Sequence, residues 1–263
     1  MDQRSLSSIR KAGKEAILRR YPPLFWWYVY MRHGHLEPEM ALLPALCRRE
    51  ATSVDVGANY GIYSHYLSKL STKCVAFEPY PHLAEILRSG LKGRVRIESV
   101  ALSNRSGQTA MLAAPNETGL NTIEPTNRIS AKAKDPSSLT TLAVPVSRLD
   151  DFQLEQVGFL KIDVEGHEEE VIEGGEETIR RYVPAILIEI EERHRSGARD
   201  RISNRLSSFG YEGFFLHQEA LHPLNSFDPD RLQNIERPDD YIRNFIFLPR
   251  SRMGEYAASL PFR

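Results

Sequence analysis

The chain has 263 residues, of which 41% are hydrophobic and 26% charged, with a formal net charge of −1 and two cysteines. This length suits one large α/β domain with small additions. The near-neutral charge argues against a protein that grips nucleic acid by charge alone. Two cysteines cannot form a disulfide framework, and no apolar run is long enough to span a membrane, so we predict a cytoplasmic protein with free thiols.

Residues 1–50 are predicted to form a helical and aromatic extension. Basic residues precede the stretch YPPLFWWYVYM at residues 21–31, which lacks the continuous apolar core and the cleavage site of a signal peptide. We favour a segment docked on the main domain. The alternative is peripheral membrane contact through residues 21–31, where aromatic and basic residues lie side by side.

Strand and helix patterns alternate from about residue 51, and they predict the fold class. Short apolar runs predict strands at residues 52–56, 74–78, 94–103, 158–163 and 185–190. Apolar residues at helical spacing follow four of these runs, near residues 62–70, 83–87, 164–179 and 202–209. This order predicts an α/β fold with a doubly wound, mostly parallel sheet.

The predicted domain occupies residues 51–250 and is followed by a tail at residues 251–263. Two β segments, GFFLH and NFIFLP, close the domain, the last as an antiparallel strand. Residues 107–146 interrupt the alternation, because they are rich in Thr, Ser, Asn and Pro. They are predicted to be an inserted loop and β region, and loops of that length in compact domains are commonly functional.

The stretch VDVGANYG contains the first candidate site. Its strand ends at Asp55, where the carboxyl edge of a parallel sheet collects ligands, and Gly57 and Gly61 allow close approach to the backbone. The dinucleotide fingerprint G-x-G-x-x-G fails, because Asn59 and Ile62 occupy its second and third glycine positions. A carboxylate at this place disfavours phosphate and suits S-adenosylmethionine, which carries an ammonium, a sulfonium and a ribose diol.

Glu78 ends the second predicted strand, 21 residues after Gly57. An acid at about this distance typically accepts hydrogen bonds from ribose hydroxyls. The alternative is that Asp55 and Glu78 only cap helices. The combination of both acids with the glycines favours nucleoside binding.

The stretch FLKIDVEGHEEEVIEGG contains the second candidate site. Asp163, Glu165 and His167 follow the fourth strand, and Glu189 lies at the end of the fifth, so all four are candidate catalytic residues. One of them could act as a general base for an acceptor hydroxyl. Alternatively, Asp163 and Glu189 could hold a divalent cation. The remaining acids of this segment are expected on a solvated helix face: Glu168, Glu169, Glu170, Glu173, Glu176 and Glu177.

With these motifs in the order VDVGANYG, FEPYP, VALSNRSG, SRLDDF and FLKIDVEGHEEEVIEGG, followed by ILIEI, the sequence resembles the FkbM family of S-adenosylmethionine-dependent methyltransferases. The resemblance spans about residues 53–190. It implies a class I methyltransferase fold, which is Rossmann-like, and O-methylation of a hydroxyl on a sugar, glycan or natural product.

The resemblance also implies roles for individual residues. Glu78, followed by Pro79, would hold the ribose hydroxyls, and Ala101 and Leu102 would contact the adenine. The stretch from Asp163 would face the reacting methyl group and the acceptor. The first loop would line the methionine and ribose end of the cofactor, through Asp55, Gly57, Ala58, Asn59 and Gly61.

Three other functions fit the sequence less well. The missing second and third glycines of the dinucleotide fingerprint argue against an NAD-dependent oxidoreductase. The two acids at strand ends, Asp55 and Glu78, argue against a non-catalytic adaptor. An RNA methyltransferase is disfavoured by the near-neutral charge. The chain does contain a local run of arginines, for which we favour a solvated helix face, at residues 193, 195, 199, 201 and 205.

Overall fold

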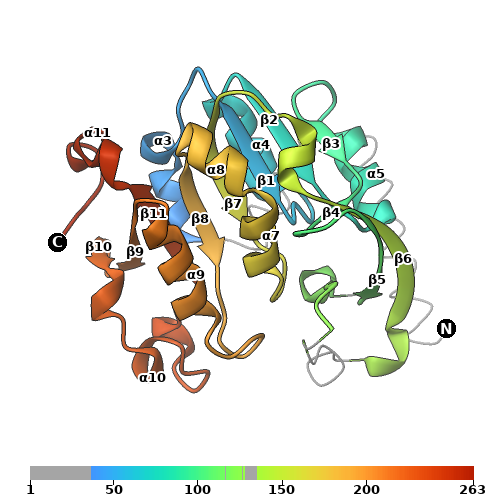
Figure 1. Ribbon diagram of the computed structural model, residues 1–263. Helices are drawn as coiled ribbons and strands as arrows, with labels where there is room; N and C mark the ends of the chain where they lie inside the picture. Colours follow the sequence, from blue (N-terminus) through green and yellow to red (C-terminus); the bar gives the residue numbers. More distant parts are fainter. Residues whose placement is uncertain (1–36, 116, 126, 128–134) are drawn as a thin grey trace.

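The computed structural model describes residues 37–115, 117–125, 127 and 135–263 (Figure 1). Its centre is an eight-stranded sheet in the order β10-β9-β11-β8-β7-β1-β2-β3. The strands from β8 to β3 run parallel, whereas β11 is antiparallel to both β8 and β9, and β10 is antiparallel to β9. The predicted α/β fold with a largely parallel sheet and an antiparallel C-terminal strand is confirmed.

The elements are bounded as follows. The strands of the large sheet are β1 (Thr52–Val56), β2 (Lys73–Phe77), β3 (Arg96–Glu98), β7 (Val157–Ile162), β8 (Ala185–Glu189), β9 (Tyr211–His217), β10 (Ala220–Pro223) and β11 (Asn244–Pro249). The helices are α3 (Leu43–Leu46), α4 (Ile62–Leu70), α5 (Pro81–Gly90), α7 (Glu168–Gly174), α8 (Glu176–Tyr182), α9 (Ala198–Ser208), α10 (Pro229–Leu232) and α11 (Met253–Ala257). Short 3₁₀ turns are η1 (Pro38–Leu42), η2 (Thr118–Leu120), η3 (Pro136–Ser138), η4 (Leu149–Phe152), η5 (Leu224–Ser226), η6 (Pro238–Asp240) and η7 (Arg250–Arg252).

Helices cover both faces of the large sheet (Figure 1). Successive residues of a strand point to opposite faces, so Leu160 packs in the core beneath α7, α8 and α9 while Phe159 packs in the core beneath α3, α4 and α5. Most of the buried strand side chains are apolar, although Asp55 and Lys161 are buried too. This two-sided burial explains why the strands read as continuous apolar runs.

A second sheet of three strands lies beside the carboxyl edge of the large sheet. It has the order β4-β6-β5, with β4 (Ala101–Leu102), β5 (Gly107–Ala113) and β6 (Thr140–Ser147). The hairpin of β5 and β6 is antiparallel, and residues 117–125 return from its tip toward the carboxyl ends of the parallel strands. The described parts of the segment 107–146 therefore contribute β structure to the edge where ligands bind.

Three details differ from the sequence-based expectation. The run at residues 94–103 forms two strands, β3 and β4, which belong to different sheets. The helix expected over 164–179 is two helices, because α7 ends and α8 begins at the paired glycines 174 and 175. Residues 1–36, including the aromatic stretch 21–31, lie outside the described residues. Among the described helices, none is both long and apolar enough to cross a membrane.

Acids on α7 pair with three of the five arginines after β8, whereas Arg193 pairs with Glu191 and Arg199 with Asp200. Arg195 pairs with Glu170, Arg201 with Glu169 and Arg205 with Glu173. These pairs hold α9 against α7 across the surface of the sheet. Three arginines of the run therefore take part in ion pairs with α7, whereas the sequence predicted a solvated helix face.

Glu168 corrects the prediction of a solvated acidic face. Its side chain is buried at the start of α7, and its Oε1 accepts a hydrogen bond from the N–H of Gly166 at 2.9 Å. A buried acceptor of this kind holds the turn that leads into α7, whose first residue is Glu168 itself. The sequence pattern missed this, since Glu168 lies among five other glutamates.

The burial of Glu168 predicts a pH-dependent stability. Burial raises the pKa of this carboxyl from 4.5 to about 7, although backbone N–H groups oppose the rise. The folded chain thus keeps a proton that the unfolded chain loses between pH 4.5 and about 7, so this contribution to stability is lost as the pH rises through that window. In urea unfolding, we expect Glu168→Gln to stabilise the protein more at pH 8 than at pH 5, by on the order of 1–3 kcal/mol. The exposed Glu177→Gln is the control, and an equal shift in both variants would contradict the account.

Candidate active site

The loop after β1 is fixed in a conformation that favours glycine. Gly57 and Gly61 both have φ +79°, and Asn59 between them has φ +49°. A Cβ on Gly57 would lie 1.8 Å from the backbone oxygen of Asp163, which is an impossible contact. The N–H groups of residues 57 and 58 donate to the carbonyl of Phe77, so the loop is bound to the end of β2. The missing Cβ allows the loops after β1 and β7 to touch.

Glu78 lies at the end of β2 and is held by the loop after β1. Its carboxylate accepts hydrogen bonds from the N–H of Asn59 at 2.7 Å and from the N–H of Tyr80 at 2.9 Å. Burial raises the pKa of Glu78 to about 7, and these two N–H groups oppose the rise. The carboxylate is therefore fixed in orientation before any ligand arrives, as a group that binds ribose hydroxyls should be.

Asp55 lies behind this loop. Its Oδ2 accepts a hydrogen bond from the hydroxyl of Ser64 at 2.5 Å, inside the junction between β1 and α4. Burial raises the pKa of Asp55 to about 6, and the Ser64 hydroxyl opposes the rise. Its side chain does not line the cavity described below, and neither do Ala58 and Gly61. The structure thus makes Asp55 a support for the loop.

A cavity with about 230 Å³ of water-accessible space runs along the carboxyl ends of β2, β1, β7 and β8. Six of the nine residues predicted to bind the cofactor line it: Gly57, Asn59, Glu78, Pro79, Ala101 and Leu102. Three of the four predicted catalytic residues also line it: Asp163, Glu165 and Glu189. The end near β2 and β4 is apolar apart from Glu78, with Phe77, Val100 and Met111 in its wall.

The opposite end of the cavity is dominated by charge. Asp163 follows β7 and lies 3.5 Å from the ammonium of the buried Lys161, whereas Glu189 ends β8 and lies 3.4 Å from the guanidinium of Arg243. Burial alone lowers the pKa of Lys161, but Asp163, Glu37 and Glu189 outweigh it, so this lysine keeps its charge. Burial raises the pKa of Glu189 well above its ordinary value, and Asp163 adds to the rise.

The charge of the lining residues favours a cationic ligand. Burial favours the protonated forms of Glu78 and Glu189, but three further acids, Glu37, Asp163 and Glu165, line the cavity together with a single arginine. Lys161 adds one positive charge just behind the wall. A negative surplus in a partly enclosed site attracts positive charge, because field lines are focused there.

His167 is not brought to the cavity. Its ring lies on the other side of the loop after β7, between Ser103, Glu124 and Glu170. Glu191 is also outside, paired with Arg193 and Tyr241. Strand alternation would have placed Glu191 on the same face as Glu189, but β8 ends at Glu189, so the alternation does not continue.

The sequence missed several residues of the cavity wall. The side chain of Glu37 accepts hydrogen bonds from Tyr63, Arg243 and Asn244. Arg243 directly precedes the antiparallel strand β11, whose start lies at the edge where the parallel strands end. The place of Arg243 just before the last predicted strand is therefore a sequence signal that could have identified it as a residue of the cavity wall. The wall also takes residues from the segment between β5 and β6, namely Thr118, Gly119, Asn121, Thr122 and Ile123.

Comparison with known proteins finds relatives of this chain. Residues 55–216 match the family described as the methyltransferase FkbM domain. The chain is 27% identical over 190 residues to the methyltransferase sdnD of Sordaria araneosa, a match that covers 60% of this chain and 73% of that protein.

A search of solved structures finds, among others, a methyltransferase FkbM from Methylobacillus flagellatus, with a TM-score of 0.49 and 15% identity, covering 92% of this chain. This chain spans only 60% of the length of that protein. Another is a putative methyltransferase from Streptococcus mutans in complex with SAH, with a TM-score of 0.45 and 9% identity, covering 81% of this chain and 96% of that chain.

The fold and the matched domain define an S-adenosylmethionine-dependent methyltransferase with an α/β sheet. The match covers more than half of the chain, and the chain therefore belongs to the methyltransferase FkbM family. The predicted family, enzyme class and cofactor are confirmed, and the oxidoreductase and adaptor interpretations are set aside. The cavity fits the cofactor, because Gly57 leaves room beside Asp163, Glu78 offers a fixed carboxylate, and the acidic end suits a cation.

Proposed function

We propose that the protein transfers a methyl group to a hydroxyl of a sugar, glycan or natural-product small molecule. The observation that carries this proposal is the buried carboxyl of Glu189 in the cavity wall, with its pKa raised by burial and by Asp163. A raised pKa makes a carboxylate a stronger base, and hydroxyl acceptors need proton removal before or during attack.

The two ends of the cavity are assigned different roles. The strands β2 and β8 lie three sheet spacings apart, about 14 Å, so the two ends are far enough apart for separate tasks. We assign the end with Glu78, Ala101 and Leu102 to the nucleoside. We assign the end with Asp163 and Glu165 to the positively charged part of the cofactor and to the acceptor.

S-adenosylmethionine, when bound, supplies an electrophilic methyl group on a sulfonium. Glu189 is assigned as the general base that takes the proton of the acceptor hydroxyl. Arg243, 3.4 Å from Glu189, holds that carboxylate in place. In the cavity wall, the buried amide nitrogen of Asn121 has no hydrogen-bond partner among the described residues, which suits an acceptor that carries hydroxyls.

A divalent cation at Asp163 and Glu189 is an alternative source of activation. The donor oxygens of Asp163, Glu165 and Glu189 lie within 4.8 Å of one another, which is close enough to share an ion. Lys161 and Arg243 already supply positive charge to two of them. We therefore propose proton transfer to Glu189 without a metal.

We also place the protein in the cytoplasm, on the basis of its two free cysteines, Cys47 and Cys74.

The experiment is a transfer assay with methyl-labelled S-adenosylmethionine and a panel of acceptors. Hydroxyl-bearing sugars, glycans and small natural products are compared with amines and RNA, each with and without EDTA. The expected result is a methyl ether, identified by NMR and mass spectrometry, whose formation is unchanged by EDTA. Transfer to nitrogen, carbon or RNA alone would contradict the proposal, and loss of transfer with EDTA would replace the metal-free mechanism with the metal-dependent one.

A further inference from the structure

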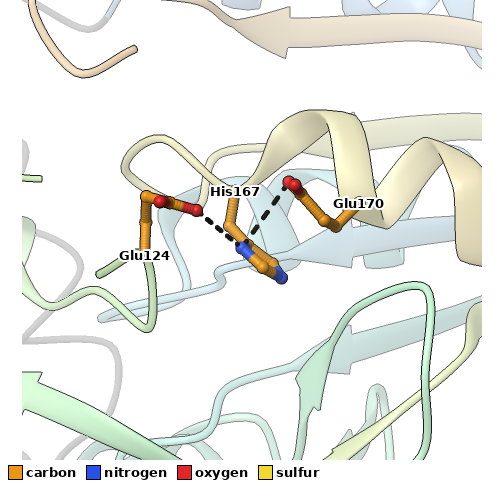
Figure 2. Close-up of side chains that lie close together, drawn as sticks. All are labelled: Glu124, His167 and Glu170. Atoms are coloured by element: carbon orange, nitrogen blue, oxygen red, sulfur yellow. Dashed lines mark hydrogen bonds and ion pairs between the residues drawn. The ribbon is translucent and has the colours of Figure 1, made fainter. Parts of the chain in front are cut away.

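A second cluster of titratable side chains lies outside the cavity. It consists of Glu124, His167 and Glu170 and is called the His167 cluster (Figure 2). His167 directly precedes α7, and Glu170 lies in the first turn of that helix. Glu124 comes from the segment between β5 and β6, immediately after residues 118–123 in the cavity wall. The cluster therefore joins two elements that are far apart in the sequence.

The three donor atoms have the spacing of a metal site. Nδ1 of His167 lies 3.2 Å from Oε2 of Glu124 and 3.6 Å from Oε2 of Glu170. Donors at 2.0–2.1 Å from a tetrahedral zinc ion are about 3.3–3.4 Å apart. Figure 2 shows both carboxylates turned toward the same ring nitrogen. The side chains could close around an ion with small movements.

The other polar atoms of these side chains are held as in metal sites. Nε2 of His167 lies 2.9 Å from the hydroxyl of Ser103, and that hydroxyl donates to Oδ1 of Asn104. Nε2 is therefore the hydrogen-bond donor, and Nδ1 is the nitrogen that faces the carboxylates. Oε1 of Glu170 accepts from Arg195 at 2.6 Å, which orients this carboxylate. Partners of this kind fix the ring and the carboxylates of metal ligands.

A proton on Nδ1 would satisfy only part of the cluster. It could be donated to Glu124, which is within hydrogen-bonding distance, but Oε2 of Glu170 is buried and has no hydrogen-bond partner among the described residues. Buried polar atoms without a partner are rare and need an explanation. A metal ion would bind Nδ1 and both carboxylate oxygens together.

We propose that the His167 cluster binds a divalent transition-metal ion, of which Zn²⁺ is the best fit, with water as the fourth ligand. A nitrogen donor beside two carboxylates suits Zn²⁺ or Co²⁺, whereas the all-oxygen group of Asp163, Glu165 and Glu189 suits Mg²⁺. The ion ties Glu124 to α7, and so it fixes the wall of the cavity formed by residues 118–123. This role is structural and does not depend on the acceptor.

The test measures metal binding directly. Protein freed of metal with a chelator is titrated with ZnCl₂ by calorimetry and with CoCl₂ by visible absorption. We expect one ion per chain in the wild type and a loss of affinity of at least tenfold in His167→Ala and in Glu170→Gln. Glu173→Gln is the matched control, because it removes the same charge from α7 at an ion pair outside the cluster. Glu189→Gln tests whether the acidic cluster in the cavity binds the ion instead.

Two outcomes would overturn the proposal. One is the absence of binding in the wild type, which would leave His167 as a hydrogen-bond partner of Glu124 only. The other is binding that survives in Glu170→Gln and His167→Ala, or is lost in Glu189→Gln. Circular dichroism shows whether each variant folds. Should His167→Ala fail to fold, Glu170→Gln decides, and its melting temperature should no longer rise with ZnCl₂ as that of the wild type does.

Discussion

Glu189→Gln is expected to lower kcat for methyl transfer by about 10²–10⁴-fold, the usual contribution of a general base. The amide has the same shape as the carboxyl, so the contact with Arg243 and the packing at the end of β8 change little. What is lost is the ability to accept a proton from the acceptor. Because burial and Asp163 raise the pKa of Glu189, the wild-type kcat should rise with pH as this group loses its proton.

The control is Glu191→Gln, two residues further along the chain and outside the cavity. Its carboxylate accepts a hydrogen bond from Tyr241 at 2.8 Å, which an amide oxygen can also accept. Its kcat should stay near the wild-type value. Binding of S-adenosylhomocysteine, measured by calorimetry, should be unchanged in both variants. A kcat for Glu189→Gln within threefold of the wild type, with the same pH profile, would rule out Glu189 as the base.

Gly57→Ala is expected to destabilise the fold by about 2–5 kcal/mol and to abolish cofactor binding. The left-handed φ of +79° costs a residue with a Cβ about 1–2 kcal/mol. The contact of this Cβ with the Asp163 carbonyl, at 1.8 Å, forces the loops after β1 and β7 apart, and overpacking of this kind costs about 1–3 kcal/mol more. Urea unfolding measures the first effect and calorimetry the second.

Gly93→Ala separates the two costs. Gly93 also has a left-handed φ, +68°, but nothing lies within 4 Å of the position of its Cβ. We expect this variant to lose only the backbone contribution of about 1–2 kcal/mol and to bind the cofactor normally. Equal losses in both variants would show that the loops after β1 and β7 do not need to touch, and the cavity would require another explanation.

The sequence predicted the part of the site that follows local rules. Carboxyl ends of neighbouring parallel strands meet at one edge, so the position of Glu78 and Asp163 could be inferred from strand ends alone. The role of Gly57 could also be predicted, because glycine at the end of a strand indicates close approach of the backbone. These rules need only a parallel sheet, which the alternation of strand and helix patterns predicts.

The rest of the site depends on packing that one sequence does not encode locally. Asp55 fits the strand-end rule, but its side chain turns to Ser64, under α4, because it is buried behind the loop. His167 lies in the right loop, yet a positive φ at Glu165 and Gly166 turns the chain before it reaches the cavity. Glu37 enters the wall from the opposite end of the chain, with no motif to mark it.

The most direct measurement is calorimetric titration of S-adenosylhomocysteine into the wild type, Glu78→Gln and Glu98→Gln, with NAD as the competing ligand. The predicted result is one site in the wild type and in the Glu98 variant, binding that is roughly 10- to 100-fold weaker in Glu78→Gln, and no binding of NAD. Glu98 serves as the control because it lies on β3 and pairs with Arg96. Equal affinity in all three proteins, or occupation of the site by NAD in place of S-adenosylhomocysteine, would contradict the assignment of Glu78 to the cofactor site.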